Sequence, residues 1–503
     1  MSGVKGIVDE LTGCPRDRIS RIAGTGTKSA RYRRLILVGS GEKFVRPVNY
    51  LLGCKIGSDV RDSRALVSLS ARGAKVAVGH DIANLDLLSE RPSCVIVSYA
   101  AIPDTNPELR EARRLGIPIR TRSQVLAQLM KGYRTLLVAG THGKTSTTSM
   151  AIVSFQGFGC DPSFAVGGAL HETGTNAHHG SGDLFIAEAD ESDASLLQYR
   201  ASIAIVTNVE PDHLNFFGTA EAYCQVFADF LDCIEPGGAL IVCVDDPGSR
   251  TLALYAAQRG IRVLGYGTAT AAAQAQRDGI PMGGVLEAWE PTLDGLAARI
   301  RLAGDDSSRE LVLPVPGEHM ALNALSTLVA VREYGGDMRA ALEALTHFGG
   351  VNRRFQYHGQ VGGIRVYDDY AHHPTEARAV LTAAREVADA DAQGLGHPGR
   401  VVVCFQPHLY SRTEQFATEF AHALDLADYA IVLDIYGARE NPMPGVTSEL
   451  ITRQLTIPHK YQPDFSKVPY DVAAIAEPGD IVLTMGAGNV TMEADAIIAL
   501  LKG

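Results

Sequence analysis

The segment LLVAGTHGKTSTTSM, residues 136–150, decides the fold class of this chain. Its pattern predicts an apolar strand, a short loop bracketed by Gly140 and Gly143, and a helix that begins near Lys144. Glycines let backbone N–H groups approach phosphate oxygens, and a lysine and a helix N-terminus both add positive charge there. The order strand, loop, helix favours a phosphate-binding loop over the alternative, a glycine-rich turn with an incidental lysine.

Every residue of this loop is a candidate for nucleotide binding. The candidates are Gly140, Thr141, His142, Gly143, Lys144, Thr145 and Ser146. The Thr145 hydroxyl can also reach Mg²⁺, and Lys144 is a catalytic candidate because its charge would act on the transferring phosphoryl group. The loop has the form G-x-x-G-K-T, and Val138 stands where the commoner G-x-x-x-x-G-K-[ST] pattern has its first glycine.

Composition places the chain among ordinary globular proteins and excludes several partners. It has 503 residues, 46% hydrophobic and 20% charged, which is enough for about three domains. A net charge of -11 argues against nucleic acid as a partner. Because no apolar run approaches about 20 residues and no export signal opens the chain, we expect neither a membrane partner nor secretion, but a cytoplasmic protein. The eight cysteines lack C-x-x-C spacing, so we expect reduced thiols.

Alternating strand-like and helical stretches predict an α/β fold made of three blocks with parallel sheets. The expected parts are a mobile basic extension at residues 1–34 and α/β blocks at residues 35–133, 134–349 and 350–503. Residues 267–284 and 390–399 have a linker-like composition and are expected to be surface insertions.

Acidic residues gather directly after the expected strand at residues 184–188. They are Glu188, Asp190, Glu191 and Asp193. Such a group either faces water as a solvated loop or meets a cation, because carboxylates are costly to bury unpaired. Loops at the ends of parallel strands converge on one edge of a sheet, so Glu188 is expected to lie beside the phosphate loop and bind Mg²⁺.

Three further motifs follow apolar strands and carry polar side chains. The segment TNVEPDHLNFFG, residues 207–218, presents His213, which could share a second metal ion with Glu188. DDYAHHPTE and QPHLYSRT, residues 368–376 and 406–413, present histidine, aspartate, tyrosine and arginine where α/β sheets place ligands. Taken singly, each of these side chains could be a plain surface residue. Together they suit acyl-phosphate chemistry, in which separate domains deliver ATP, a carboxylate and an amine.

Taken together, seven motifs resemble the Mur ligase family over residues 35–503. They are GTHGKTSTTS, GGALHETGTNAHHGSGDLFIAEADESD, TNVEPDHLNFFG, GEHMALNAL, GVNRRF, DDYAHHPTE and QPHLYSRT. The resemblance implies an N-terminal Rossmann-like domain for a UDP-sugar, a central P-loop ATPase domain and a C-terminal Rossmann-like domain that brings an amino acid. It also implies an ATP- and Mg²⁺-dependent carboxylate:amine ligase of peptidoglycan synthesis, with UDP-N-acetylmuramate and L-alanine as the reference substrates.

The resemblance further assigns roles to individual residues. Lys144 and Thr145 would hold the β- and γ-phosphates and Mg²⁺, with Glu188 and His213 as the other metal ligands. Asn323, Arg354 and Asp369 would meet the nucleotide. His372, His373, His408, Tyr410 and Arg412 would surround the acyl phosphate and amino acid, while Thr175 and Asn176 would contact substrate. The helical segment after His213 contains no lysine, so the carbamylated lysine of some relatives is not expected.

The first loop of the N-terminal block departs from the family pattern G-x-G-G-x-G-M-S. Gly39 and Gly41 are present as candidate substrate contacts, but Glu42 and Phe44 replace the next two glycines. A carboxylate and a bulky ring there oppose the usual pose of a diphosphate. Asp59, 20 residues after Gly39, has the spacing of an acid that binds a ribose hydroxyl. Either the drifted loop still binds the same ligand through side chains, or the substrate has changed.

The sequence therefore leaves three functions open. The first is the amide-forming ligase acting through an acyl phosphate. The second is a paralogue that joins another carboxylate to an amino acid in specialised metabolism, and the third is a non-catalytic nucleotide-binding regulator. The complete set of Lys144, Thr145, Glu188, His213 and Asp369 argues against the third. The sequence leaves the oligomeric state open.

Overall fold

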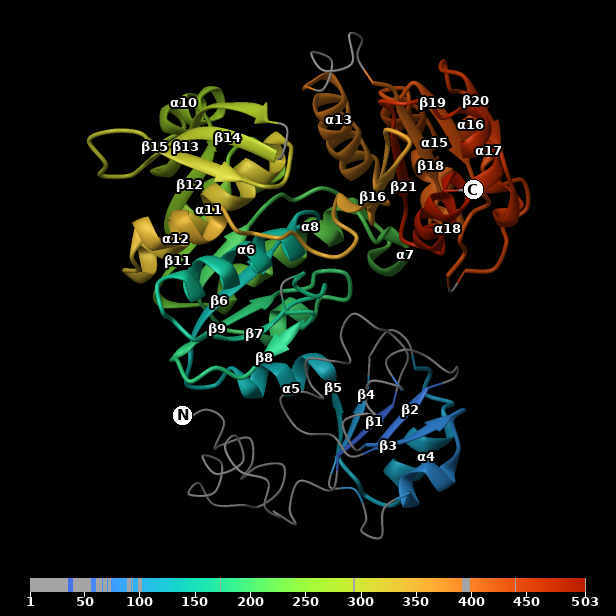
Figure 1. The fold of residues 1–503 in the computed structure, drawn as a ribbon. Helices are drawn as coiled ribbons and strands as arrows, with labels where there is room; N and C mark the ends of the chain where they lie inside the picture. The colour runs from blue at the N-terminus through green and yellow to red at the C-terminus, as the bar shows by residue number, and fades with distance from the viewer. Residues whose placement is uncertain are drawn as a thin grey trace.

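The structure is a computed structural model that describes most of the chain. The described residues are 35–38, 56–59, 66, 70, 74–87, 92, 94–97, 102–171, 173–292, 295–390, 399–438 and 440–502. The expected basic extension, the altered loop at residues 39–46 with Gly39 and Gly41, and residues 391–398 lie outside them. Figure 1 shows three lobes, each around its own sheet. All three sheets fall within the expected blocks, although the block boundaries themselves stay predictions.

The N-terminal sheet is parallel, with strand order β3-β2-β1-β4-β5. Its strands are β1 (Leu35–Val38), β2 (Ile56–Asp59), β3 (Lys75–Val78), β4 (Cys94–Val97) and β5 (Ile119–Thr121), and its α-helices with described bounds are α4 (Pro107–Arg114) and α5 (Arg122–Leu129). The sequence IGSD of β2 has no apolar run, which is why that strand was not predicted. This strand order is that of doubly wound sheets, which bind ligands at the carboxyl ends of their strands.

The central sheet has ten strands in the order β15-β14-β13-β12-β11-β10-β6-β9-β7-β8. The strands are β6 (Arg134–Ala139), β7 (Ser163–Ala165), β8 (Ala177–His178), β9 (Leu184–Glu188), β10 (Ala201–Val206), β11 (Ile234–Cys243), β12 (Arg262–Thr268), β13 (Met282–Thr292), β14 (Gly295–Leu302) and β15 (Arg309–Leu313). The helices are α6 (Lys144–Gly157), α7 (Leu214–Phe217), α8 (Ala220–Phe230), α9 (Pro247–Gln258), α10 (Ala269–Arg277), α11 (Glu318–Tyr334) and α12 (Met338–Leu345). Its middle is parallel, whereas β13, β14 and β15 add an antiparallel edge.

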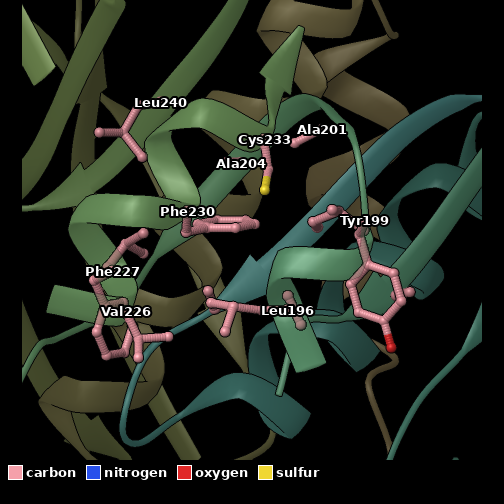
Figure 2. Close-up of a cluster of buried hydrophobic side chains, with 14 of the residues drawn as sticks. Leu196, Tyr199, Ala201, Ala204, Val226, Phe227, Phe230, Cys233 and Leu240 are labelled. Carbon is pink, nitrogen blue, oxygen red and sulfur yellow. The ribbon is translucent and has the colours of Figure 1, made fainter. Parts of the chain in front are cut away.

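Both faces of the strand before the phosphate loop are buried, which explains its continuous apolar sequence. Leu136 and Val138 pack under α6 and α11, while Leu137 and Ala139 face the core beneath α5, α8 and α9. Figure 2 shows part of this second core, in which Phe227 and Phe230 of α8 are among the labelled aromatic side chains. Strand β6 is thereby fixed between two cores, so the loop that follows it starts from a rigid position.

The expectation of a surface insertion at residues 267–284 is wrong. The segment ends β12, forms α10 and begins β13. Ala272 and Ala275 of α10 are buried against the sheet. The alanine-rich sequence that resembled a linker has instead a high helix propensity, and two of its methyl groups fill the core.

The C-terminal sheet has six strands in the order β16-β17-β21-β18-β19-β20, and only β16 is antiparallel to its neighbour. The elements are β16 (Gln356–Val361), β17 (Ile364–Asp369), α13 (Pro374–Ala390), β18 (Val401–Phe405), α15 (Tyr410–Leu424), β19 (Tyr429–Val432), α16 (Glu449–Thr452), β20 (His459–Tyr461), α17 (Val468–Ile475), β21 (Ile481–Met485) and α18 (Thr491–Leu501). Helices α13 and α15 cover one face, and α17 and α18 cover the other. No helix in the described part of the chain is both long and apolar enough to cross a membrane.

Candidate active site

The phosphate loop connects β6 to α6 and has a backbone that only glycine tolerates at two positions. Gly140 has a φ of 136°, and a Cβ atom there would lie 2.0 Å from Oγ1 of Thr207. Gly143 is left-handed, with a φ of 80°, and caps the N-terminus of α6. Ser146 lies in the first turn of that helix and is buried. The strand, loop and helix predicted from residues 136–150 are confirmed.

Residues after the neighbouring strand β10 hold this loop in place. Asn208 accepts a hydrogen bond from the His142 backbone N–H at 2.7 Å through Oδ1, and Thr207 donates its hydroxyl proton to the His142 carbonyl. The Thr141 hydroxyl donates to the Glu210 carbonyl at 2.9 Å. The loop conformation is therefore set by the motif TNVEPDHLNFFG as well as by its own glycines.

The Lys144 side chain is 15% exposed and turns back over the loop. Its Nζ donates to the carbonyl oxygens of Gly140 at 2.6 Å and Thr141 at 3.0 Å, and it lies 2.8 Å from Oε2 of Glu191. Burial opposes the charge, but the carboxylates of Glu191 and Asp190 outweigh it and raise the pKa of Lys144. The ammonium group therefore stays charged at the point where a phosphate would enter the loop.

Glu188 is the last residue of β9, which pairs with β6, the strand that leads into the phosphate loop. Its Oε1 accepts a hydrogen bond from Gly167 N–H at 2.7 Å. A Cβ atom on Gly167 would lie 2.8 Å from Oε2 of Glu188, and one on Gly168 would lie 3.1 Å from Cγ2 of Thr145. Gly167 thus lies against the Glu188 carboxylate, and Gly168 lies against the methyl groups of Val351 and Thr145. The carboxylate oxygens of Glu188 are donors that suit Mg²⁺.

His213 lies between two carboxylates, those of Glu191 and Asp212. Its backbone is left-handed, with a φ of 53°, and its Nε2 lies 3.6 Å from Oδ2 of Asp212 and 3.9 Å from Oε1 of Glu191. Burial lowers the pKa of His213, which favours the neutral imidazole that a metal ion requires.

A buried ion pair joins the central domain to the C-terminal domain. Nη2 of Arg412, on α15, lies 2.7 Å from Oδ1 of Asp212, and the two side chains are only 5% and 6% exposed. Burial opposes ionisation of Asp212, but Arg412 holds its pKa well below the usual range. Both residues line a pocket of about 300 Å³ with His213, Leu409, Ser411 and Phe416.

The remaining candidates of the C-terminal domain gather at the same junction. His372 Nδ1 lies 3.2 Å from Oε2 of Glu376. The ring centroid of His372 is 5.6 Å from that of His408. His408 Nδ1 in turn contacts Arg412 Nη1 at 3.0 Å. The His373 ring centroid is 4.5 Å from that of His142, in the phosphate loop. Tyr410 begins α15, and its ring packs over Gly437.

Asn323, Arg354 and Asp369 also border the loop or its surroundings. Asn323 of α11 approaches Gly143, where an added Cβ would meet its Oδ1 at 3.1 Å. Asp369 accepts backbone N–H groups of Phe355 and Ala371 at 2.7 and 2.6 Å, and burial raises its pKa to about 6. Arg354 Nη1 lies 3.7 Å from Oε1 of Glu376.

Three of the substrate-binding candidates, Thr175, Asn176 and Asp59, lie on segments outside the phosphate loop. The carbonyls of Thr175 and Asn176 accept hydrogen bonds from Leu170 and Val166 N–H at 3.0 and 2.9 Å, which puts them on the segment that continues from Gly167 and Gly168. Asp59 ends β2 and is buried at the carboxyl edge of the N-terminal sheet.

Sequence reasoning gave no individual role to four acidic residues that the structure places in the site. Glu191, Glu210, Asp212 and Glu376 contact Lys144, His142, Arg412 and His372 respectively. The spacing of Glu376, four residues after His372, was a usable signal, because residues four apart can meet at the start of a helix. The others depended on contacts between distant segments.

Comparison with known proteins decides the family. The chain matches the models for the Mur ligase family catalytic domain at residues 54–134, the Mur ligase middle domain at residues 138–331 and the Mur ligase glutamate ligase domain at residues 353–488. Together these ranges cover most of the chain. The chain belongs to the Mur ligase family.

Relatives of this Mur ligase are similar over nearly its whole length. UDP-N-acetylmuramate--L-alanine ligase of Rhodococcus jostii (strain RHA1) is 54% identical over 489 residues, covering 94% of this chain and 97% of the relative. The protein of that name from Mycolicibacterium smegmatis is 53% identical over 474 residues, covering 93% and 95%. The crystal structure of UDP-N-acetylmuramate-alanine ligase from Thermotoga maritima is 24% identical with a TM-score of 0.73, covering 93% and 99%.

These comparisons confirm the family and the three-part α/β architecture expected from the seven motifs. This Mur ligase is an ATP-dependent ligase. The roles of individual side chains rest on the geometry described above and stay predictions.

Proposed function

We propose that this Mur ligase joins UDP-N-acetylmuramate to L-alanine with ATP and Mg²⁺, through an acyl phosphate. A continuous line of contacts carries the proposal, running from Lys144 to Glu191, His213, Asp212 and Arg412. It connects the phosphate loop to the C-terminal domain. A ligase of this kind needs its phosphoryl donor and its amine acceptor to meet at one protected place. The relatives that are 53–54% identical, with that activity in their names, support the choice of substrates.

The proposed roles follow from position. Residues 140–146 would bind the ATP phosphates, with Asn323, Arg354 and Asp369 completing the site. Lys144 would stabilise negative charge on the transferring phosphoryl group. Mg²⁺, when held by Thr145, Glu188 and His213, would neutralise charge on the phosphates.

The C-terminal histidines would serve the second half of the reaction. The substrate carboxylate first takes the γ-phosphoryl group and releases ADP, and the amine then displaces phosphate and loses a proton. Burial holds the pKa of His372 well below its ordinary value, so His372 is neutral and would serve as a hydrogen-bond partner of the incoming amine. Arg412, His373, His408 and Tyr410 would position the amino acid and the acyl phosphate beside it.

The two other functions considered from sequence have less support. A paralogue that acts on another carboxylate is less well supported, because the chain is 54% identical over 489 residues to a protein named UDP-N-acetylmuramate--L-alanine ligase. A non-catalytic regulator would have no use for the complete line of contacts. The proposed substrates, ATP, a UDP-sugar and an amino acid, agree with the cytoplasmic location expected from sequence.

Glu188→Ala and His213→Ala are each expected to raise the Mg²⁺ concentration needed for half-maximal product formation. The reason is that each substitution removes a proposed ligand of the same ion. Because they share that ion, the double variant should be less impaired than the sum of the two single effects. The measurement is product formation against Mg²⁺ concentration, and curves identical to wild type in both variants would remove the two residues from the metal site.

Binding of UDP-N-acetylmuramate tests the substrate independently of turnover. We expect calorimetric titration to give micromolar affinity, on the order of -8 kcal/mol, for the wild-type protein. N-acetylmuramate, which lacks the UDP group, serves as the control and is expected to bind much more weakly.

The Glu42→Gly, Phe44→Gly double variant then tests the altered loop. Binding equal to or moderately tighter than wild type is expected, because a negative charge is removed and the backbone can approach the diphosphate. Absent binding to wild type, together with acceptance of a carboxylate that lacks the diphosphate, would overturn the proposed substrate.

A further inference from the structure

Three side chains outside the proposed magnesium ligands form a compact group between the domains. His142 comes from the phosphate loop, Glu210 from the segment after β10, and His373 from the residue before α13. One ligand atom from each lies within 4.8 Å of the others. Two imidazoles and a carboxylate are thereby gathered from three separate segments.

Two nitrogen atoms of this group are buried without a hydrogen-bond partner. They are Nε2 of His142 and Nε2 of His373. The two side chains are only 9% and 6% exposed, so water does not readily compensate. A buried polar atom left unsatisfied costs about 1–3 kcal/mol. Nε2 of His373 therefore calls for a ligand, and Nε2 of His142 has only a long contact of 3.6 Å to Oε2 of Glu210.

Neighbouring residues orient the group. Oε1 of Glu376 lies 3.3 Å from Nδ1 of His142, which directs Nε2 toward Glu210, where the distance to Oε2 is 3.6 Å. The Thr375 hydroxyl donates to Oε2 of Glu210 at 2.6 Å. A carboxylate on the far nitrogen of a histidine is the usual outer partner of a metal-bound imidazole, because it fixes the ring and its tautomer.

We propose that His142, Glu210 and His373 bind a divalent transition-metal ion of the Zn²⁺ class. Two histidines and one glutamate are a common ligand set for Zn²⁺, whereas Mg²⁺ prefers oxygen ligands, so this site differs in chemistry from that of Thr145, Glu188 and His213. Tetrahedral bonds of about 2.0–2.1 Å place ligand atoms about 3.4 Å apart, so binding draws the three side chains inward.

The metal ion has to compete with a proton. Burial opposes protonation of His142, but the nearby carboxylates of Glu210 and Glu376 outweigh it and raise its pKa to about 9. Binding at neutral pH therefore releases that proton. If no metal binds, the same residues form only charge contacts between the phosphate loop and the start of α13. The test has to distinguish this outcome from metal binding.

Metal binding would stabilise the association of the central and C-terminal domains. His142 and Glu210 belong to the central domain, and His373 belongs to the C-terminal domain. A single ion held by all three resists their separation. We therefore expect micromolar Zn²⁺ to raise the melting temperature of the wild-type protein in the absence of nucleotide, because only the joined form offers three ligands.

Cobalt(II) absorption spectroscopy on the full chain tests the site without turnover. Co²⁺ is titrated into the protein in excess Mg²⁺, so that the proposed magnesium site is occupied, and Zn²⁺ is added afterwards. The expected result is one equivalent of intense visible absorption, typical of tetrahedral coordination, that Zn²⁺ displaces. His373→Ala should weaken binding at least about 100-fold and Glu376→Gln about 10-fold, the latter by loss of the outer partner.

Two further variants separate this site from the others. His213→Ala, which alters a proposed magnesium ligand, should keep the cobalt signal. His358→Ala is the matched control. His358 Nδ1 lies 3.1 Å from Oδ1 of Asp495, so this substitution also removes an imidazole that lies beside a carboxylate in the C-terminal domain. Circular dichroism confirms that each variant is folded. No intense signal in wild type, or an unchanged signal in folded His373→Ala and Glu376→Gln, would overturn the proposal, whatever the protein's ligase activity.

Discussion

Lys144→Ala is expected to reduce ATP-dependent product formation by at least about 100-fold, the typical effect of removing one preorganised electrostatic contact from a transition state. In the structure the ammonium group is partly buried, turned over the phosphate loop and 2.8 Å from Oε2 of Glu191. We expect a phosphate that enters the loop to replace that carboxylate as the partner of the lysine. The measurement is the initial rate of product formation with saturating substrates.

Lys131→Ala is the matched control, since Lys131 is exposed just before β6 and is expected to leave the rate unchanged. The melting temperature of Lys144→Ala should be measured beside the rate, because its removal leaves Glu191 buried without a cation. A folded Lys144→Ala protein that forms product at a near-normal rate would contradict the assignment of the phosphate loop.

Arg412→Ala is expected to lower kcat/KM by about 100-fold or more and also to lower the melting temperature. Breaking a buried ion pair from one side costs about 3–5 kcal/mol, because the remaining charge has no partner. Here the remaining charge is Asp212, which is 6% exposed and reached by Arg412 from the other domain. Loss of the pair should favour separation of the domains in addition to removing a proposed contact to the amino acid.

A second substitution separates the two effects. Asp212→Asn in the Arg412→Ala background should restore much of the melting temperature, since the unpaired charge is gone, while kcat/KM stays low. Arg453→Ala is the control: its pair with Glu449 is exposed and is expected to contribute only about 0–1 kcal/mol. Wild-type kcat/KM in Arg412→Ala would show that the interdomain pair has no part in catalysis.

The fold was predictable where one short pattern determines one element. Residues 136–150 specified strand, loop and helix, and the buried strands β9, β10 and β18 followed from apolar runs. β2 was missed because IGSD carries no apolar signal, and α10 was mistaken for an insertion because alanine-rich sequence occurs in both linkers and helices. The antiparallel edge of β13 to β15 depends on pairing between strands, which local periodicity does not report.

The candidate site was predictable in composition but not in its connections. Strand-end positions predicted that Lys144 lies near the acidic segment after β9, and the structure places it 2.8 Å from Glu191. His372 and Arg412 follow the ends of β17 and β18, and their part in ligand binding stays a prediction. The sequence could not show that Glu376 reaches His142, or that Arg412 pairs with Asp212, because those contacts depend on how two domains dock. The loop at residues 39–46 lies outside the described residues, so its effect on the diphosphate stays a prediction.

The most direct test of the central claim is the product itself. The purified protein is incubated with ATP, Mg²⁺, UDP-N-acetylmuramate and L-alanine, and the mixture is resolved by mass spectrometry. The account predicts UDP-N-acetylmuramoyl-L-alanine in a one-to-one ratio with ADP and phosphate, and no product when either substrate or ATP is left out. An active ATPase that forms no such product, but couples a different carboxylate to an amino acid, would contradict the account.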